Sequence, residues 1–189
     1  RARVIGRVFQ DPMKGTAPNM TIEENLAMAY TRSGRHSSMF SRAITKEKVK
    51  FFRENLARYN MGIEDRMKTK IGLLSGGQRQ VVTLLMCTLS VPKLLLLDEH
   101  TAALDPATAK KVMEITRTIV EENHITTMMI THNLQQALDT GNRTIMMDSG
   151  EIVYDVAGEE REKLSMQDLV RLFGEKRNRE LTNDRMMLG

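Results

Sequence analysis

The sequence predicts an α/β fold built on a mostly parallel sheet. Short apolar runs alternate with stretches of helical periodicity, which is the order that parallel strands and crossover helices produce. The run 94–97 is four leucines without alternation, as expected of a strand buried on both faces. Three runs end on polar residues, namely Gln10, the pair Asp98 and Glu99, and His132. Because functional sites of such sheets lie at the carboxyl ends of the strands, we expect these side chains to converge.

The composition narrows the class of protein. The 189 residues are 41% hydrophobic and 28% charged, which is typical of a domain with a buried core. Basic residues exceed acidic ones by four with the signs interspersed, so the charge does not call for nucleic acid, and no such partner is expected. The single cysteine excludes an intrachain disulfide, which fits a reducing compartment. No apolar run approaches the roughly 20 residues that cross a bilayer.

The first elements are predicted to be a strand, a loop and a capped helix. Residues 4–9 are apolar and partly β-branched and end at Asp11-Pro12, whereas 13–20 contain Gly, Pro and Asn. Thr21 and Glu24 form a capping-box pattern, which predicts a short helix through Tyr30.

A Ser/Arg-rich loop is expected at 31–44, followed by a helix that Thr45 caps. The apolar residues of this helix recur at spacings of three and four, which places them on one face. These residues are Val49, Phe52, Leu56 and Tyr59. A polar connector is expected at 62–70.

The middle of the chain predicts a helix, a buried strand and a second helix. Residues 74–77, Leu-Ser-Gly-Gly, open a helix at about 78–90, and Pro92 ends it. The strand 94–97 follows, and Asp105-Pro106 then places a capping residue before a proline at the first helical position. The predicted buried face of this second helix is Val112, Ile115 and Ile119.

The last third predicts a strand, a hairpin and helices. The expected elements are a strand at 125–130, a short helix at 133–138, hairpin strands at 143–147 and 152–156, a helix at 162–175 and a polar tail at 176–189. The turn 148–151, Asp-Ser-Gly-Glu, supports the hairpin.

Asp98 and Glu99 are the first candidate for chemistry. Adjacent carboxylates at the end of a buried strand are costly unless something uses them, although a strand end that reaches solvent carries them cheaply. One carboxylate can hold Mg²⁺, directly or through water, and the other can orient or deprotonate an attacking water.

The second candidate is the segment Ser75, Gly76, Gly77 and Gln78. Serine and two glycines at a helix N-terminus expose backbone N–H groups and direct the positive end of the helix dipole at an anion such as phosphate. An ordinary helix start would have the same residues. His132 could bond a phosphate oxygen, or could be a structural histidine.

Taken together, these motifs resemble the nucleotide-binding domain of ABC-type ATPases over about residues 1–157. The motifs are Gln10, the run Leu74 to Gln80, the run Leu94 to Glu99, Ala103 to Asp105, and His132. The resemblance implies a P-loop NTPase-like sheet with an α-helical signature subdomain. It places that subdomain at about 12–90, the catalytic core at 1–11 and 91–157, the whole domain at 1–175, and a tail at 176–189.

The resemblance also implies roles around ATP and Mg²⁺. Asp98 would support Mg²⁺, and Glu99 would be the catalytic residue that polarises water. Gln10 would approach both the Mg²⁺ and the water, and would sense a transmembrane partner. His132 would contact the γ-phosphate.

The remaining roles lie at a dimer seam. Ser75, Gly76, Gly77 and Gln78 would contact ATP held by a second ATPase subunit in a head-to-tail dimer, and Asp105 would lie at the seam. The implied function is the ATPase that powers an ABC transporter, importer-like for a small solute, cytoplasmic and peripheral on the inner face of the cell membrane.

The partners implied are transmembrane permease subunits, with a solute-binding protein in the complex. The permease would dock at about residues 11–40, where Met13, Met20 and Tyr30 offer apolar contact. Met28 lies in the same segment but is expected to belong to the helical core.

Two departures from the family pattern stand out. The family usually has Pro after the catalytic Glu, and here His100 is expected to be a tolerated loop substitution. No Gly-x-x-x-x-Gly-Lys-Ser/Thr phosphate loop occurs in the chain, so N-terminal strands and that loop are expected to be missing. Alone, this chain is expected to bind ATP weakly and not to hydrolyse it.

Other classes stay open at this point. An ABC ATPase of DNA maintenance would need long coiled coils between Gln10 and Ser75, where one short amphipathic helix is predicted. A ribosome-associated ABC protein would carry a second signature motif. A non-hydrolysing partner subunit would lack the phosphate loop but would not need Glu99 or His132.

Overall fold

The structure is a computed structural model that describes residues 4–32, 44–172 and 174. Most of the loop predicted at 31–44 and the tail predicted at 176–189 lie outside the described residues. The chain divides into two units, which meet in the sequence between Ile130 and Thr131. Each unit is described by itself, and the subdomain boundaries given above stay a prediction.

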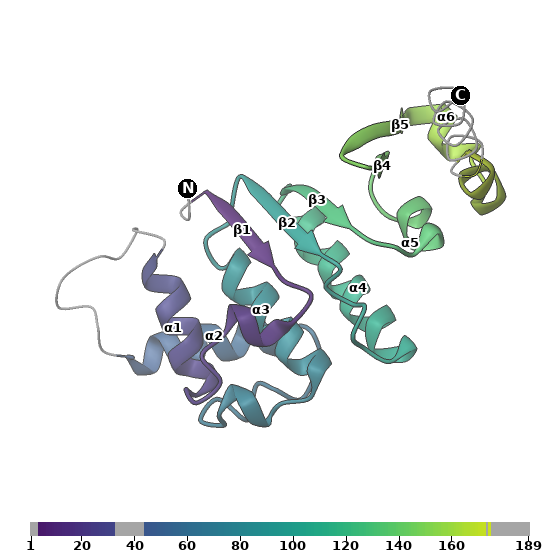
Figure 1. The fold of residues 1–189 in the computed structure, drawn as a ribbon. Helices are drawn as coiled ribbons and strands as arrows, with labels where there is room; N and C mark the ends of the chain where they lie inside the picture. The colour runs from purple at the N-terminus through teal and green to yellow at the C-terminus, as the bar shows by residue number, and fades with distance from the viewer. Residues whose placement is uncertain (1–3, 33–43, 173, 175–189) are drawn as a thin grey trace. The chain divides into compact units, whose positions relative to one another are not determined.

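The first unit contains a parallel sheet in the order β1-β2-β3 (Figure 1). The strands are β1 (Ile5–Val8), β2 (Leu94–Asp98) and β3 (Thr126–Ile130). Val8 pairs with Leu97, and Asp98 pairs with Ile130, so the carboxyl ends of the strands share one edge. The predicted α/β class with a parallel sheet is confirmed.

The helices of the first unit begin largely where the sequence places their caps. They are the 3₁₀ turns η1 (Pro12–Gly15) and η2 (Ile71–Leu73) and the helices α1 (Ile22–Arg32), α2 (Lys46–Ala57), α3 (Gly76–Thr88) and α4 (Pro106–Glu122). The Thr21 hydroxyl accepts the Glu24 N–H, and the Thr45 hydroxyl accepts the Lys48 N–H, as the capping patterns predict. Helix α3 starts two residues before the predicted position because its capping residue is Ser75.

One apolar core joins the sheet to the helices. Leu95 and Leu97 of β2 are buried together with residues of α3 and α4. The segment 62–70 is not simply the polar connector that was predicted, because Ile63 and Met67 are buried in the same core. Its backbone is tied to the start of α1, where the Glu23 N–H donates to the Met67 carbonyl.

Helices α1 and α2 meet through aromatic rings. Tyr30 packs edge-on against Phe52, and the ring centroids are 5.9 Å apart. Phe52 is fully buried and Phe51 is exposed. Met28 was expected in this core, but the expectation is wrong, because 44% of the residue is exposed on the outer side of α1.

Buried Asn25 fastens the loop that precedes α1 to the helix. Its side-chain oxygen accepts the Ala17 N–H at 2.8 Å, and its amide nitrogen donates to the carbonyls of Ala17 and Thr21. Asn25 itself is fully buried, so its amide depends on these partly buried backbone groups for hydrogen bonds. The contact fixes the path of the chain between Gln10 and α1.

The second unit contains a hairpin and short helices. It comprises α5 (Leu134–Asp139), β4 (Arg143–Asp148), β5 (Glu151–Ala157) and α6 (Gly158–Glu162). The antiparallel pair turns through Ser149 and Gly150, both at positive φ, which suits the twist of a two-residue hairpin loop. The predicted hairpin is confirmed.

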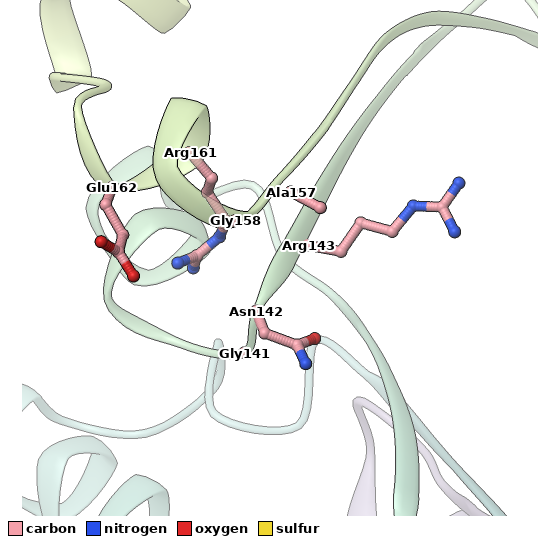
Figure 2. Close-up of a pocket in the computed structure, with 7 residues that line it drawn as sticks. All are labelled: Gly141, Asn142, Arg143, Ala157, Gly158, Arg161 and Glu162. Carbon is pink, nitrogen blue, oxygen red and sulfur yellow. The ribbon is translucent and has the colours of Figure 1, made fainter.

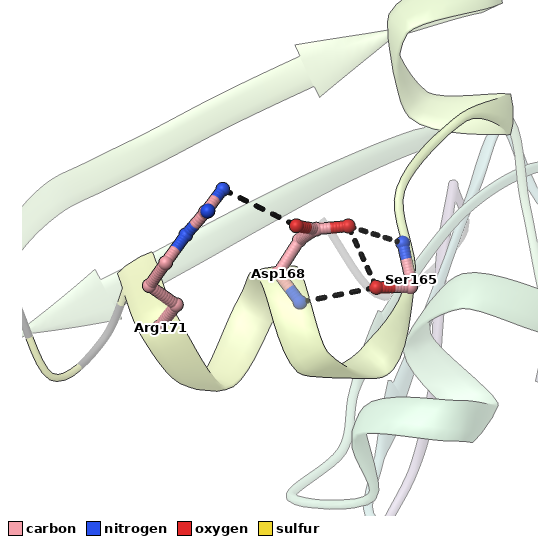
Figure 3. A network of polar contacts seen from close by, with 3 residues as sticks. All are labelled: Ser165, Asp168 and Arg171. Carbon is pink, nitrogen blue, oxygen red and sulfur yellow. Dashed lines mark hydrogen bonds and ion pairs between the residues drawn. The ribbon is translucent and has the colours of Figure 1, made fainter.

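The helix predicted at 162–175 begins later than predicted. Helix α6 ends at Glu162, residues 163–165 are not helical, and helical structure resumes at 166–172. Figure 3 shows the reason, because the Ser165 hydroxyl accepts the Asp168 N–H while the Asp168 carboxylate accepts the Ser165 N–H. This reciprocal capping starts a new helix, and an ion pair from Arg171 to Asp168 adds to it.

We predict that Asn25→Ala lowers the free energy of unfolding by about 1–3 kcal/mol, because partly buried backbone groups of Ala17 lose their partner. Denaturant unfolding measures the change. Asn55→Ala is the matched control, since the Asn55 amide donates to the Phe51 carbonyl in a solvent-exposed bond within α2. Equal losses in the two variants would contradict the prediction.

Candidate functional site

The end of β2 brings two of the predicted site residues to one sheet edge. Asp98 is the last residue of β2, and Gln10 lies two positions beyond Val8, the end of the adjacent strand. Gln10 is exposed. The Asp98 carboxylate accepts a hydrogen bond from the Arg7 guanidinium at 2.8 Å, and its side chain is 35% exposed.

Glu99 follows Asp98 in an unusual backbone conformation. Its φ is +44°, in the left-handed region that residues with a Cβ seldom adopt. Its N–H donates to the Ile130 carbonyl at 3.0 Å, and its carbonyl accepts the Ala102 N–H at 2.9 Å. These bonds extend the β2–β3 pairing by one residue and then close a turn.

His100 is part of the core rather than a tolerated loop residue, so that expectation is corrected. The residue is 2% exposed, and its Nε2 lies 3.1 Å from the Thr116 hydroxyl of α4. The Thr116 hydroxyl donates its hydrogen to the Val112 carbonyl at 2.8 Å. It can therefore only accept from His100, so Nε2 of the ring carries the hydrogen and donates it to Thr116. Burial lowers the pKa of His100 to about 4, which keeps the ring neutral at neutral pH.

The segment Ser75–Gln78 forms a capping box at the start of α3. The Ser75 hydroxyl accepts the Gln78 N–H at 3.2 Å, and the Gln78 side-chain oxygen accepts the Ser75 N–H at 3.2 Å. The Gln78 amide nitrogen also donates to the Met61 carbonyl. The Gln78 side chain thus holds the helix start, while Ser75 and Gly76 are exposed.

Gly77 is required by packing inside the protein. A Cβ at this position would lie 2.1 Å from the Thr108 methyl group, a distance no real contact tolerates. At Gly76 a Cβ would meet only the tip of the flexible Leu104 side chain, at 3.1 Å. The start of α3 therefore sits directly on the start of α4, for a reason that the motif alone does not reveal.

Asp105 caps α4 beside this contact. Its carboxylate accepts the Thr108 N–H at 3.0 Å. Hydrogen bonds from the Thr108 side chain and backbone hold the pKa of Asp105 below its ordinary value. The structure thus joins the segment Ser75–Gln78, called the signature segment below, to Asp105 through Thr108.

His132 belongs to the second unit. It is exposed and lies in the turn before α5, between Thr131 and the capping residue Asn133. The Asn133 N–H donates to the Thr131 hydroxyl, which fixes the turn. Its convergence with Gln10 and Asp98 stays a prediction.

The second unit contains a hollow whose two arginines already have bonding partners within the protein. Figure 2 shows it between the starts of β4 and α6, lined by Gly141, Asn142, Arg143, Ala157, Gly158, Arg161 and Glu162. The Arg161 guanidinium donates to the carbonyls of Leu138 and Thr140, at the end of α5, and to the Thr144 hydroxyl. Arg143 pairs with Asp155. Both cations are thus engaged within the protein.

The donor set at β2 suits a hard cation that keeps most of its water. Within the described ranges no three His, Cys, Asp or Glu side chains are grouped to hold a metal ion. Mg²⁺ usually takes one or two carboxylates and completes its shell with water and phosphate oxygens. The partly exposed Asp98 carboxylate fits that requirement.

Comparison with known proteins gives the family. The ABC transporter family model matches residues 1–102. A tyrosine transport ATP-binding protein from Clostridioides difficile is 43% identical over 173 residues, covering 92% of this chain and 68% of that protein. The methionine import ATP-binding protein MetN of Streptococcus agalactiae is 31% identical over 90% of this chain and 46% of its own length.

A solved structure agrees with this match. An ABC transporter described as metal-chelate type, in an inward-facing conformation, superposes with a TM-score of 0.70 at 26% identity. The match covers 90% of this chain and 64% of that one. The chain belongs to the ABC transporter family, and its relatives are ATP-binding components of transport systems.

We predict that Gly77→Ala lowers the free energy of unfolding by about 1–3 kcal/mol, because the new methyl group overlaps Thr108. Thr108→Ser removes the clashing methyl group and leaves the Thr108 Cβ at 3.6 Å, an ordinary contact, so the double variant should recover most of the loss. Denaturant midpoints of the single and double variants measure this.

Gly76→Ala is the control for the added helix propensity of alanine. A double variant no more stable than Gly77→Ala alone would contradict the close contact.

Proposed function

We propose that this chain supplies the Mg²⁺-supporting, water-activating and signature positions of an ATPase that powers a membrane transporter. The observation that carries the proposal is the end of β2, where Asp98 and Glu99 follow a buried strand at the edge shared with Gln10. The names of the relatives, which include tyrosine transport and methionine import, favour an importer-like system for a small solute.

Each residue has a task in phosphoryl transfer. Asp98 would hold Mg²⁺, which neutralises charge on the phosphate oxygens of ATP. Glu99 would orient the attacking water and accept its proton, and Gln10 would hold that water from the adjacent strand. His132 would donate to the γ-phosphate. The reaction is thus one of positioning and electrostatic stabilisation.

The signature segment would serve a second subunit. Ser75 already satisfies the Gln78 N–H, so the donor on an exposed residue of this helix start is the backbone N–H of Gly76, which lies next to buried Gly77. The exposed Ser75 hydroxyl would add a side-chain contact. A head-to-tail dimer would bring ATP to this helix start, and Asp105 would lie at the seam through its contact with Thr108.

The permease contact is proposed for the segment at about 11–40, with attachment to the inner face of the membrane through that partner. In its described part, Met13 and Met28 are exposed and supply apolar surface. Asn25 holds the loop between them in place. Within the described residues no helix has the length and apolarity that a bilayer crossing needs. A solute-binding protein would complete an importer.

We predict that Glu99→Gln lowers ATP turnover by about 100-fold or more, because an amide cannot accept the proton of the attacking water. The protein to test is a form extended upstream to the full reach of its relatives, since these 189 residues contain no Gly-Lys-Ser/Thr phosphate loop. Binding of a fluorescent ATP analogue, phosphate release and dimer formation are the readouts.

The variant should bind Mg-ATP and accumulate as an ATP-bound dimer. Glu114→Gln, an exposed carboxylate on α4, is the control and should turn over normally. If Glu99→Gln hydrolyses ATP at the parent rate, Glu99 is not the residue that activates water. If the extended form fails to bind Mg-ATP, the chain is instead part of a non-hydrolysing partner subunit.

A further inference from the structure

Three of the points that hold the turn after β2 involve Glu99 and His100. The Glu99 N–H bonds to β3 through the Ile130 carbonyl, and the Glu99 carbonyl accepts the Ala102 N–H. The third point is the ring of His100, which reaches away from the sheet edge to α4. Adjacent residues of this turn therefore face opposite surroundings, Glu99 partly exposed and His100 buried.

The contact between His100 and Thr116 is a hydrogen bond between two buried side chains. Thr116 is 4% exposed, and its hydroxyl is donor to Val112 and acceptor from the His100 ring. A hydrogen-bonded ring at this depth is placed in direction as well as in position, whereas an apolar side chain would be placed by volume alone. The link extends from the turn to the third turn of α4.

We propose that His100, through Thr116, is a positioning residue that holds Glu99 in its left-handed conformation for the water activation proposed above. The inference rests on that proposed function.

His100 acts on Glu99 through the peptide bond that joins the two residues. Once His100 is fixed to α4, the orientation of the shared peptide, and so the backbone angle ψ of Glu99, is set by its neighbour. A left-handed Glu99 costs roughly 1 kcal/mol or more and persists only where the surroundings impose it. Without the link, only the two backbone hydrogen bonds of Glu99 oppose a shift toward an ordinary conformation, and such a shift would move its carboxylate away from the attacking water.

The experiment uses the extended form that binds Mg-ATP and separates kcat from KM for ATP. Thr116→Val keeps the shape of the side chain and removes the acceptor, whereas Thr116→Ser keeps the hydroxyl. His100→Leu removes the donor, and His100→Gln retains an N–H donor at a similar reach. We expect Thr116→Val and His100→Leu to lower kcat by about 10- to 100-fold, the effect of a displacement near 1 Å, with KM little changed.

Rescue distinguishes positioning from stability. Thr116→Ser and His100→Gln should recover most of the lost kcat. Ile119→Ala, one turn further along α4, is a destabilising control in the same core and should leave kcat near the parent value at a temperature where every variant is folded. Equal losses of kcat in Ile119→Ala and Thr116→Val would overturn the proposal.

The Glu99→Gln variant separates the two hypotheses. If it abolishes hydrolysis while Thr116→Val and His100→Leu turn over at the parent rate, the positioning role is wrong and the proposed function stands. If Glu99→Gln itself turns over normally, the proposed function fails. Should His100→Leu not fold, the isosteric Thr116→Val alone decides.

Discussion

The parallel pairing of β2 with a strand on each side is the constraint on which the first unit depends. Leu95 and Leu97 are buried, whereas Leu94 and Leu96 on the other face are partly exposed. Because residues 94–97 are all leucine, a slip of one residue would exchange one pair for the other, so the register depends on the backbone pairing with both neighbours. That register places Asp98 opposite Ile130 and one step from the end of β1, so the sheet pairing positions the carboxylates.

Helix α3 connects the signature segment to the rest of this unit. Near its start, Gly77 sits against Thr108 of α4 with no room for a side chain. One turn further, the buried Gln80 amide reaches the Phe9 carbonyl at 3.4 Å, immediately before Gln10. A displacement of α3 would thus be felt both at Asp105 and at the loop after β1, which is a physical route between the signature and the sheet edge.

Hydrogen-bonded polar side chains fix the orientation of neighbouring segments, whereas apolar packing only brings the segments close together. Asn25 and His100 are buried and hydrogen-bonded, and each lies close in sequence to a segment with a proposed role. In the second unit the partly buried Arg161 donates to carbonyls at the end of α5. An unmet buried donor costs more than a typical hydrogen bond contributes, so such links tolerate few alternatives.

The sequence by itself determined the class of fold, the capping residues and the candidate carboxylates, because periodicity, capping and strand-end polarity are local signals. It did not reveal that Met67 is buried, because that depends on how the segment 62–70 packs against the core. The start of the last helix at 166 was open to prediction, since Ser165 and Asp168 have the capping-box spacing of Thr21 and Glu24. Only the tertiary structure decided that Gly77 must lack a Cβ and that His100 is anchored in the core. Those constraints come from Thr108 and Thr116, which lie distant in sequence and are brought close by the packing of α4.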